Sequence, residues 1–199
     1  MFRSILSTLA VVLAAAVAVP TALAVDVHVR IEGKGTTIYG STQPLIASGT
    51  TPLDALESAS LIGEFYYHVA SSSFGHYVDQ IGRNPAGGSS GWVFKVNGVS
   101  PPVGADAYEL KHGDTVLWYF ATFGPSGGPP TLALTGAGRN CYRVRQQDDT
   151  GAVTVPVGAV LHVDGRVVAT TKDGRGCVGA HHSLVRATLV DTVRSNSLK

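Results

Sequence analysis

Two apolar strand segments joined by turns constrain the fold of this chain more than any other feature. Residues 91–98 read GWVFKVNG, and Trp92 and Phe94 share one face because strand side chains alternate. The Asn-Gly pair at the end of this segment is typical of a hairpin turn. Residues 116–120 read VLWYF, which is apolar on both faces. We therefore expect a central strand that is covered on both sides.

The residues before these segments predict a strand pair and then a helix. Residues 25–32 alternate between apolar and polar side chains, which is typical of a half-exposed strand, and residues 36–39 are expected to pair with it. Residues 50–59 predict a short helix with Thr51 as its N-cap and Asp54 three residues later. Two further extended segments follow, at residues 65–70 and 74–82. This order of elements predicts a β-grasp-like first domain at residues 25–123.

The same motifs, in this order, resemble the transcobalamin-like C-terminal domain. The resemblance rests on GWVFKVNG, a short proline-containing spacer, VGADAY at residues 103–108 and GDTVLW at residues 113–118, and it covers about residues 26–123. That family is of the β-grasp type and is often known in bacterial proteins only as a domain of unknown function. Its β-domain closes over a corrinoid that a separate helical barrel holds. The resemblance implies a β-grasp fold and a corrinoid-like ligand, although this sequence has no such barrel and would supply half of that site.

The first 24 residues have the organisation of a signal peptide. A positively charged start precedes an apolar run at residues 6–19, and residues 22–24 read ALA, a small-x-small cleavage signal. The alternative is a membrane anchor, but the run is shorter than the roughly 20 apolar residues that a span needs. We expect cleavage after Ala24, a mature chain without a membrane span, and a location outside the cell or at its surface.

The balance of charge argues against two classes of partner. The chain has 15 Lys and Arg and 14 Asp and Glu, and Arg3 lies in the expected signal peptide, so the mature chain is formally neutral. Binding to nucleic acid or to an anionic membrane depends on an excess of basic side chains. We therefore expect neither to be the main partner.

A glycine- and proline-rich linker at residues 124–130 precedes a second domain at residues 131–199. Short strands separated by regular turns predict a small β-sandwich there. The expected strands are 132–134, 142–146, 159–163, 167–170 and 185–189. Residues 160–176 are similar to Ig-like or prealbumin-like β-modules. The expected fold class is therefore mainly β, with an α+β first domain that has one short helix.

Cys141 and Cys177 are the only two cysteines of the chain. In an exported protein the simplest expectation is one disulfide between them. The alternatives are two free thiols in a cytosolic protein, or a metal site. No Cys-x-x-Cys spacing supports zinc, so we expect a disulfide and no bound metal.

The sequence contains no pattern that predicts catalysis. Residues 87–91 and 124–128 both match Gly-x-Ser-x-Gly, but a nucleophile elbow needs a strand before it and a helix after it. The first match precedes a strand and the second lies in the linker. The adjacent His181 and His182 would point to opposite faces of a strand, which indicates a surface pair. We expect no catalytic residues and no enzyme activity.

Aromatic side chains are concentrated in the first domain, and the second contains only Tyr142. Adjacent aromatic residues cannot all point inward, so some aromatic surface is expected to remain exposed and available for binding. The glycine-rich loop at residues 86–91 would let a ligand approach the backbone closely. We predict a ligand-binding face beside this loop, formed by Tyr66, Tyr77, Trp92 and Tyr119. The alternative for Trp92 is a place in the core.

Two functions remain open at this point. The first is an exported, non-enzymatic binding protein whose first domain takes a small ligand, corrinoid-like or otherwise, or a glycan. The second is a structural or adhesive cell-surface protein whose β-domains present a protein-binding face. The sequence predicts no resident cofactor for either function.

Overall fold

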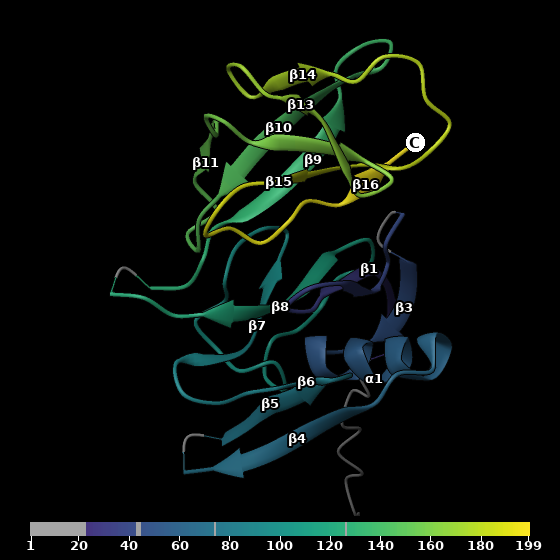
Figure 1. Cartoon of the computed structure of the whole chain (residues 1–199). Coiled ribbons are helices and arrows are strands. Elements are labelled where there is room, and N and C mark those ends of the chain that lie inside the picture. Colours follow the sequence, from purple (N-terminus) through teal and green to yellow (C-terminus); the bar gives the residue numbers. More distant parts are fainter. Residues whose placement is uncertain (1–22, 43–44, 74, 126) are drawn as a thin grey trace, which may run out of the picture.

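The computed structural model describes residues 23–42, 45–73, 75–125 and 127–199. These residues form two modules that are stacked on each other (Figure 1). The expected signal peptide lies almost entirely outside the described residues, so its cleavage stays a prediction. Within the described ranges, no helix has the length and apolar character needed to cross a membrane.

The first module is built on a five-stranded sheet with β1 (Val25–Glu32) at its centre. One edge of β1 pairs antiparallel with β3 (Leu45–Gly49) and then with β2 (Thr37–Tyr39). The other edge pairs in parallel with β8 (Thr115–Thr122), whose far edge pairs antiparallel with β7 (Ser90–Val96). The central place of β8 confirms the prediction from its two apolar faces, whereas β3 was not predicted.

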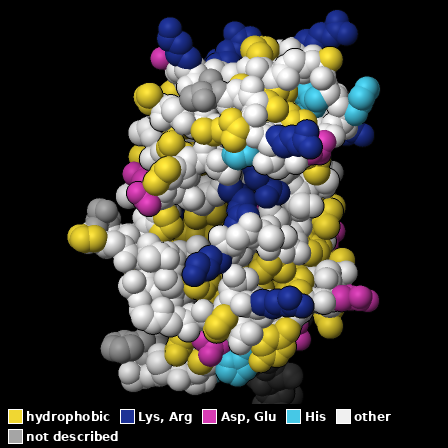
Figure 2. All heavy atoms as spheres, in the orientation of Figure 1, with side chains coloured by type: hydrophobic (Ala, Val, Ile, Leu, Met, Phe, Trp, Pro, Cys, Tyr) yellow, Lys and Arg dark blue, Asp and Glu magenta, His cyan; other side chains and the backbone are white. Residues whose placement is uncertain are grey.

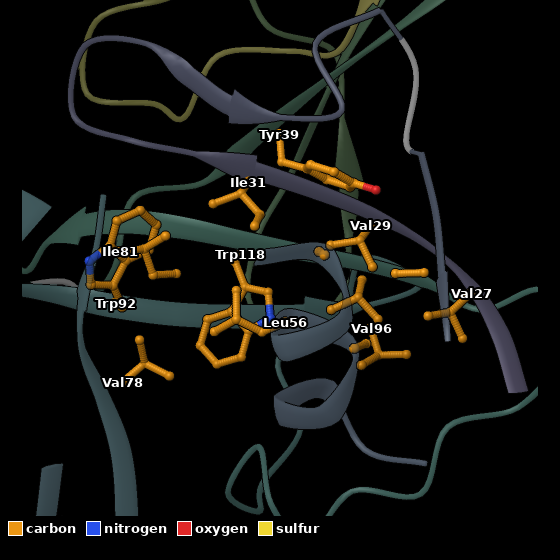
Figure 3. Close-up of a cluster of buried hydrophobic side chains, with 14 of the residues drawn as sticks. Val27, Val29, Ile31, Tyr39, Leu56, Val78, Ile81, Trp92, Val96 and Trp118 are labelled. Carbon is orange, nitrogen blue, oxygen red and sulfur yellow. The ribbon is translucent and has the colours of Figure 1, made fainter. Parts of the chain in front are cut away.

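One helix, α1 (Pro52–Gly63), covers one face of this sheet. Thr51 and Asp54 form the predicted capping box, in which each side chain bonds the backbone N–H of the other residue. The helix continues four residues beyond the predicted end and stops where Glu64 adopts a left-handed conformation. Its buried Leu56 packs in the core with Trp118 of β8, among the side chains that Figure 3 shows.

A separate three-stranded sheet extends the first module beyond α1 (Figure 1). It consists of β4 (Tyr67–Ser72), β5 (Gly75–Ile81) and β6 (Asn84–Pro85), paired antiparallel in that order. Val78 and Ile81 of β5 point into the main core, as Figure 3 shows. Much of the rest of the β4–β5 hairpin is exposed.

The second module is a sandwich of two four-stranded sheets. The first sheet contains β9 (Thr131–Gly136), β10 (Cys141–Gln147), β11 (Val153–Thr154) and β14 (Arg175–Cys177). The second contains β12 (Val160–Val163), β13 (Arg166–Thr170), β15 (Val185–Thr188) and β16 (Ser197–Leu198). Buried side chains of both sheets form one core between them. The predicted mainly β fold class is therefore confirmed for the chain.

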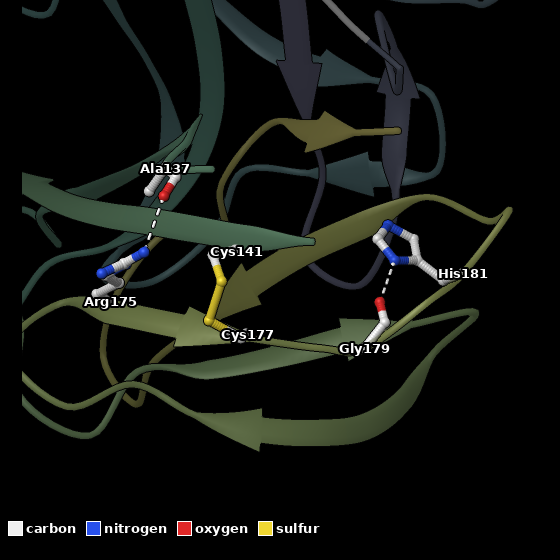
Figure 4. The surroundings of a disulfide bond; sticks show 6 residues. All are labelled: Ala137, Cys141, Arg175, Cys177, Gly179 and His181. Atoms are coloured by element: carbon white, nitrogen blue, oxygen red, sulfur yellow. Dashed lines mark hydrogen bonds between the residues drawn. A yellow bond between two sulfur atoms is a disulfide. The ribbon is translucent and has the colours of Figure 1, made fainter. Parts of the chain in front are cut away.

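The predicted disulfide is present and joins Cys141 to Cys177 (Figure 4). The two residues are direct partners in the antiparallel pairing of β10 with β14. They are 36 residues apart, and in the chain-entropy model a loop of this length gives about 4 kcal/mol of stabilisation. That is a large contribution for a module whose core is small.

Candidate functional site

The four aromatic residues predicted to form one binding face do not come together on the surface. Tyr66 and Tyr77 are 59% and 51% exposed, but Trp92 is only 7% exposed and Tyr119 only 1%. Trp92 faces the α1 side of the sheet, where its ring meets Phe120 edge-on at 5.6 Å between centroids. The alternative of a core position for Trp92 is therefore correct, and the prediction that Tyr119 is exposed is wrong.

Tyr119 is buried because the second module covers the other face of the sheet. On this face Leu117, Tyr119 and Ala121 of β8 form an apolar cluster with Val193 of the second module. The sequence predicted that both faces of β8 are covered, and the structure shows that the second module covers this face. The linker therefore joins two modules that are packed together.

A buried lysine connects the modules at this interface. The Lys95 side chain is fully buried, and its ammonium donates to the backbone carbonyls of Asp148 at 2.8 Å and Gln147 at 3.3 Å. Its Nζ also lies 3.3 Å from Asp149 Oδ1 and 3.5 Å from Thr131 Oγ1. Burial lowers the pKa of Lys95, and the negative charge of Asp149 acts in the opposite direction. Four oxygen atoms surround the ammonium group, which offsets the cost of burying its charge.

Replacing Tyr119 by Phe should remove part of the stability loss at alkaline pH. Burial first, and then the charge of Asp149, raise the pKa of Tyr119 above its usual 10.0, so the folded state keeps a proton that the unfolded chain releases near pH 10. Tyr119 therefore contributes stability that is fully present below pH 10 and is lost as pH rises toward the folded-state pKa. The expected loss is about 1 kcal/mol between pH 10 and pH 11.

Urea unfolding of the wild type and of Tyr119→Phe across this pH range measures the difference. The exposed Tyr66→Phe is the matched control for the loss of one tyrosine hydroxyl. If the free energy of unfolding depends on pH equally in the wild type and in Tyr119→Phe, the explanation is wrong.

An ionic cluster lies at the far end of the same interface. Glu32 of β1 accepts from Arg30 Nη1 at 2.7 Å and from Thr37 Oγ1 at 2.9 Å, and lies 3.1 Å from Nε of Arg194 in the second module. Arg194 also donates to the backbone carbonyls of Gly33 and Gly35. Arg30 and Glu32 are both buried, so the prediction that β1 is half exposed is wrong at this end.

A groove of about 1220 Å³ opens beside this cluster, between the two modules. Phe120 and Phe123 line it from the first module, and Pro129 and Pro130 line it from the linker. Other lining residues come from the second module: Arg186, Val190, Arg194 and Ser197. Figure 2 shows basic side chains gathered at the junction of the modules.

The groove therefore combines apolar rings with groups that donate hydrogen bonds. Arg186 donates through Nε to Ser197 Oγ at 3.0 Å, and His162 Nε2 lies 2.7 Å from Thr188 Oγ1. Such a surface can hold a ligand by stacking on its apolar parts and by hydrogen bonding to its oxygen atoms. Within the described ranges, no three His, Cys, Asp or Glu side chains are placed to hold a metal ion.

Sequence reasoning missed the groove because its residues come from distant segments. Most of its lining residues come from residues 33–34, 120–124, 127–130 and 184–197, and none of these stretches contains a binding motif. Only a weak signal of the charged cluster beside the groove was available in the sequence. Arg30 and Glu32 alternate with apolar residues in β1, a pattern that normally means exposure to solvent.

Comparisons with known proteins give a match for part of the first module. Residues 49–122 match the model of a family described as a domain of unknown function (DUF4430). This match begins at the last residue of β3 and ends with β8, and it leaves the second module outside. The narrower transcobalamin-like assignment is not confirmed by it. No curated protein matches the chain.

Among solved structures, the chain is similar to a crystal structure described as a "putative metal binding protein" from Ruminococcus gnavus ATCC 29149. The identity is 14% and the TM-score is 0.38, and the match covers 49% of this chain and 97% of the other. At this level of similarity no ligand is carried over to the present chain.

Proposed function

We propose that the protein is an exported, non-enzymatic binding protein, and that its ligand, a small molecule or a glycan, lies in the groove between the two modules. The observation that supports this most is the groove itself, which both modules and the linker line together. Its volume of about 1220 Å³ exceeds that of most small-molecule sites. It therefore has room for a large ligand, or for a segment of a glycan.

The side of the groove that Phe123, Pro129 and Pro130 line fits a ligand with flat apolar faces. Phe123 is exposed and lines the groove together with the linker residues Pro129 and Pro130. Aromatic and proline rings contact the apolar faces of sugars and macrocycles at low entropic cost. A corrinoid, which the transcobalamin-like resemblance suggests, is one candidate, and the second module would supply the other half of its site.

Titration of the isotope-labelled mature chain followed by NMR tests the site. Suitable probes are cyanocobalamin and a panel of neutral and acidic oligosaccharides, and amide shifts should concentrate on residues 120–130 and 184–197. Val190→Trp should weaken binding, because Val190 lines the groove and is 82% exposed, so a larger ring fits there without disturbing the core. Val157→Trp is the matched control, since Val157 is equally exposed but is not part of the groove.

If the protein is instead an adhesive cell-surface protein, the NMR amide shifts should follow a different pattern. Tyr66 and Tyr77 are exposed on and beside the β4–β5 hairpin, away from the groove. Rigid tyrosine side chains suit protein recognition. Shifts confined to this hairpin on addition of a cell-surface protein, with no response in the groove, would replace the proposed function by this one.

A further inference from the structure

We propose that the groove takes its ligand by an anionic group, a carboxylate or a sulfate, held by Arg186 beside Arg30 and Arg194. This inference rests on the proposed function, because it specifies the chemistry of a ligand in the same groove. A ligand with such a group on a sugar ring, as in an acidic glycan, would satisfy both the charged and the apolar parts of the groove.

The first support is an excess of positive charge beside the groove, which Arg186 and Arg194 line. Arg30 and Arg194 share one carboxylate, Glu32, which lies 2.7 Å from Arg30 Nη1 and 3.1 Å from Arg194 Nε. Arg186 is close enough to lower the pKa of both other arginines, after the larger effect of burial. Three guanidinium groups against one carboxylate leave two positive charges unbalanced. Arginine cannot relieve this repulsion by losing its proton.

The second support is the pattern of free hydrogen-bond donors. Arg194 uses all three of its nitrogen atoms, on Glu32 and on the carbonyls of Gly33 and Gly35. Arg186 uses only Nε, on Ser197 Oγ. Neither Nη atom of Arg186 has a protein partner within the described part of the chain, and the residue lines the groove. A free pair of guanidinium N–H groups binds carboxylate or sulfate in a bidentate manner.

Acidic residues at the rim do not cancel this charge. Asp164 and Asp191 line the groove but are exposed on turns, and across the described ranges neither forms an ion pair with any of the three arginines. Water and salt screen charges of this kind strongly, whereas charges at a partly buried base are screened less. An anion that enters the groove therefore meets a net attraction at Arg186.

The test compares anionic and neutral probes at constant ionic strength. Sodium sulfate, sodium glucuronate and glucose are titrated separately into the mature chain, and NMR follows the groove amides and the Arg186 side chain. We expect sulfate and glucuronate to bind at Arg186 and glucose to bind far more weakly. Tighter binding of glucuronate would identify a carboxylate source, and tighter binding of sulfate a sulfated one.

Arg186→Gln should weaken binding of both anions by roughly 10- to 100-fold, the effect of losing a hydrogen bond to a charged group. Arg139→Gln removes the same charge from an exposed turn outside the groove and should leave the affinity unchanged. In the absence of ligand, relief of the repulsion from Arg30 and Arg194 should offset the loss of the bond to Ser197 Oγ, so Arg186→Gln should melt close to the temperature of the wild type. A clear fall in its melting temperature would show a structural role and overturn the inference.

The two proposals fail in different ways. If a neutral probe or cyanocobalamin binds in the groove and Arg186→Gln binds it as tightly as the wild type, the groove is the site but the anionic inference is wrong. If anions bind equally well to Arg186→Gln, the inference is wrong as well. If no probe shifts any groove residue, both proposals are overturned.

Discussion

Replacing Glu32 by Gln should lower the free energy of unfolding by about 3–5 kcal/mol, the usual cost of removing one partner from a buried ion pair. The buried Glu32 carboxylate bonds Arg30, Arg194 and Thr37 at once. Glutamine has nearly the same shape but presents an amide N–H₂ to one of these donors. The variant would also leave Arg30, which is buried, without any negative charge nearby.

Chemical denaturation followed by tryptophan fluorescence measures this change, because Trp92 and Trp118 both lie in the first module. Glu57→Gln is the matched control. It removes the same charge from an exposed position of α1 and should change stability by less than about 0.5 kcal/mol. A loss below about 1 kcal/mol for Glu32→Gln would mean that water reaches the cluster and compensates the arginines.

The ionic cluster around Glu32 also shows which contacts the sequence could not predict. Alternation in β1 identified the strand correctly, because every second residue from Val25 to Ile31 is apolar. The same alternation implied that Arg30 and Glu32 face solvent. Their partner is Arg194, more than 160 residues away, and no local pattern can report a contact of that kind.

Features that depend on neighbouring residues were predictable. The capping box of α1, the central position of β8 and the disulfide all follow from residue types at short spacings or from the small number of cysteines. The candidate site was not predictable, because packing of one module on the other creates it. The two apolar faces of residues 116–120 predicted a covered strand, but Tyr119 was still assigned to the binding face, because nothing in the sequence indicated that the second module covers it.

Replacing Trp92 by Ala should lower the free energy of unfolding by about 3–5 kcal/mol, as expected for removal of a large aromatic side chain from a core. The ring packs edge-on against Phe120, and its Nε1 donates to the Asn84 carbonyl at 2.8 Å. The truncation therefore creates a cavity and removes the indole N–H that donates to a carbonyl of β6. Denaturant unfolding followed by the fluorescence of Trp118, which remains, measures the loss.

Tyr66→Ala is the companion measurement, because Tyr66 belonged to the same predicted binding face but is exposed. It should change stability by no more than about 0.5 kcal/mol. Trp92→Phe should fall between the two, since it keeps an aromatic ring and loses the hydrogen bond to Asn84. A loss below about 1 kcal/mol for Trp92→Ala would show that the ring is not part of the core and would restore it as a recognition residue.

The difference in burial between Trp92 and Tyr66 decides how binding experiments on the first module are interpreted. Because Trp92 and Tyr119 are buried, replacing either by Ala should perturb the fold, and weaker binding by such a variant would give no information on contact with a ligand. Tyr66, Tyr77 and Val190 are free of this ambiguity because their side chains are exposed, and for Arg186 the melting temperature of the unliganded variant resolves it. Variants of these four residues can therefore separate the groove from the aromatic hairpin as the binding surface.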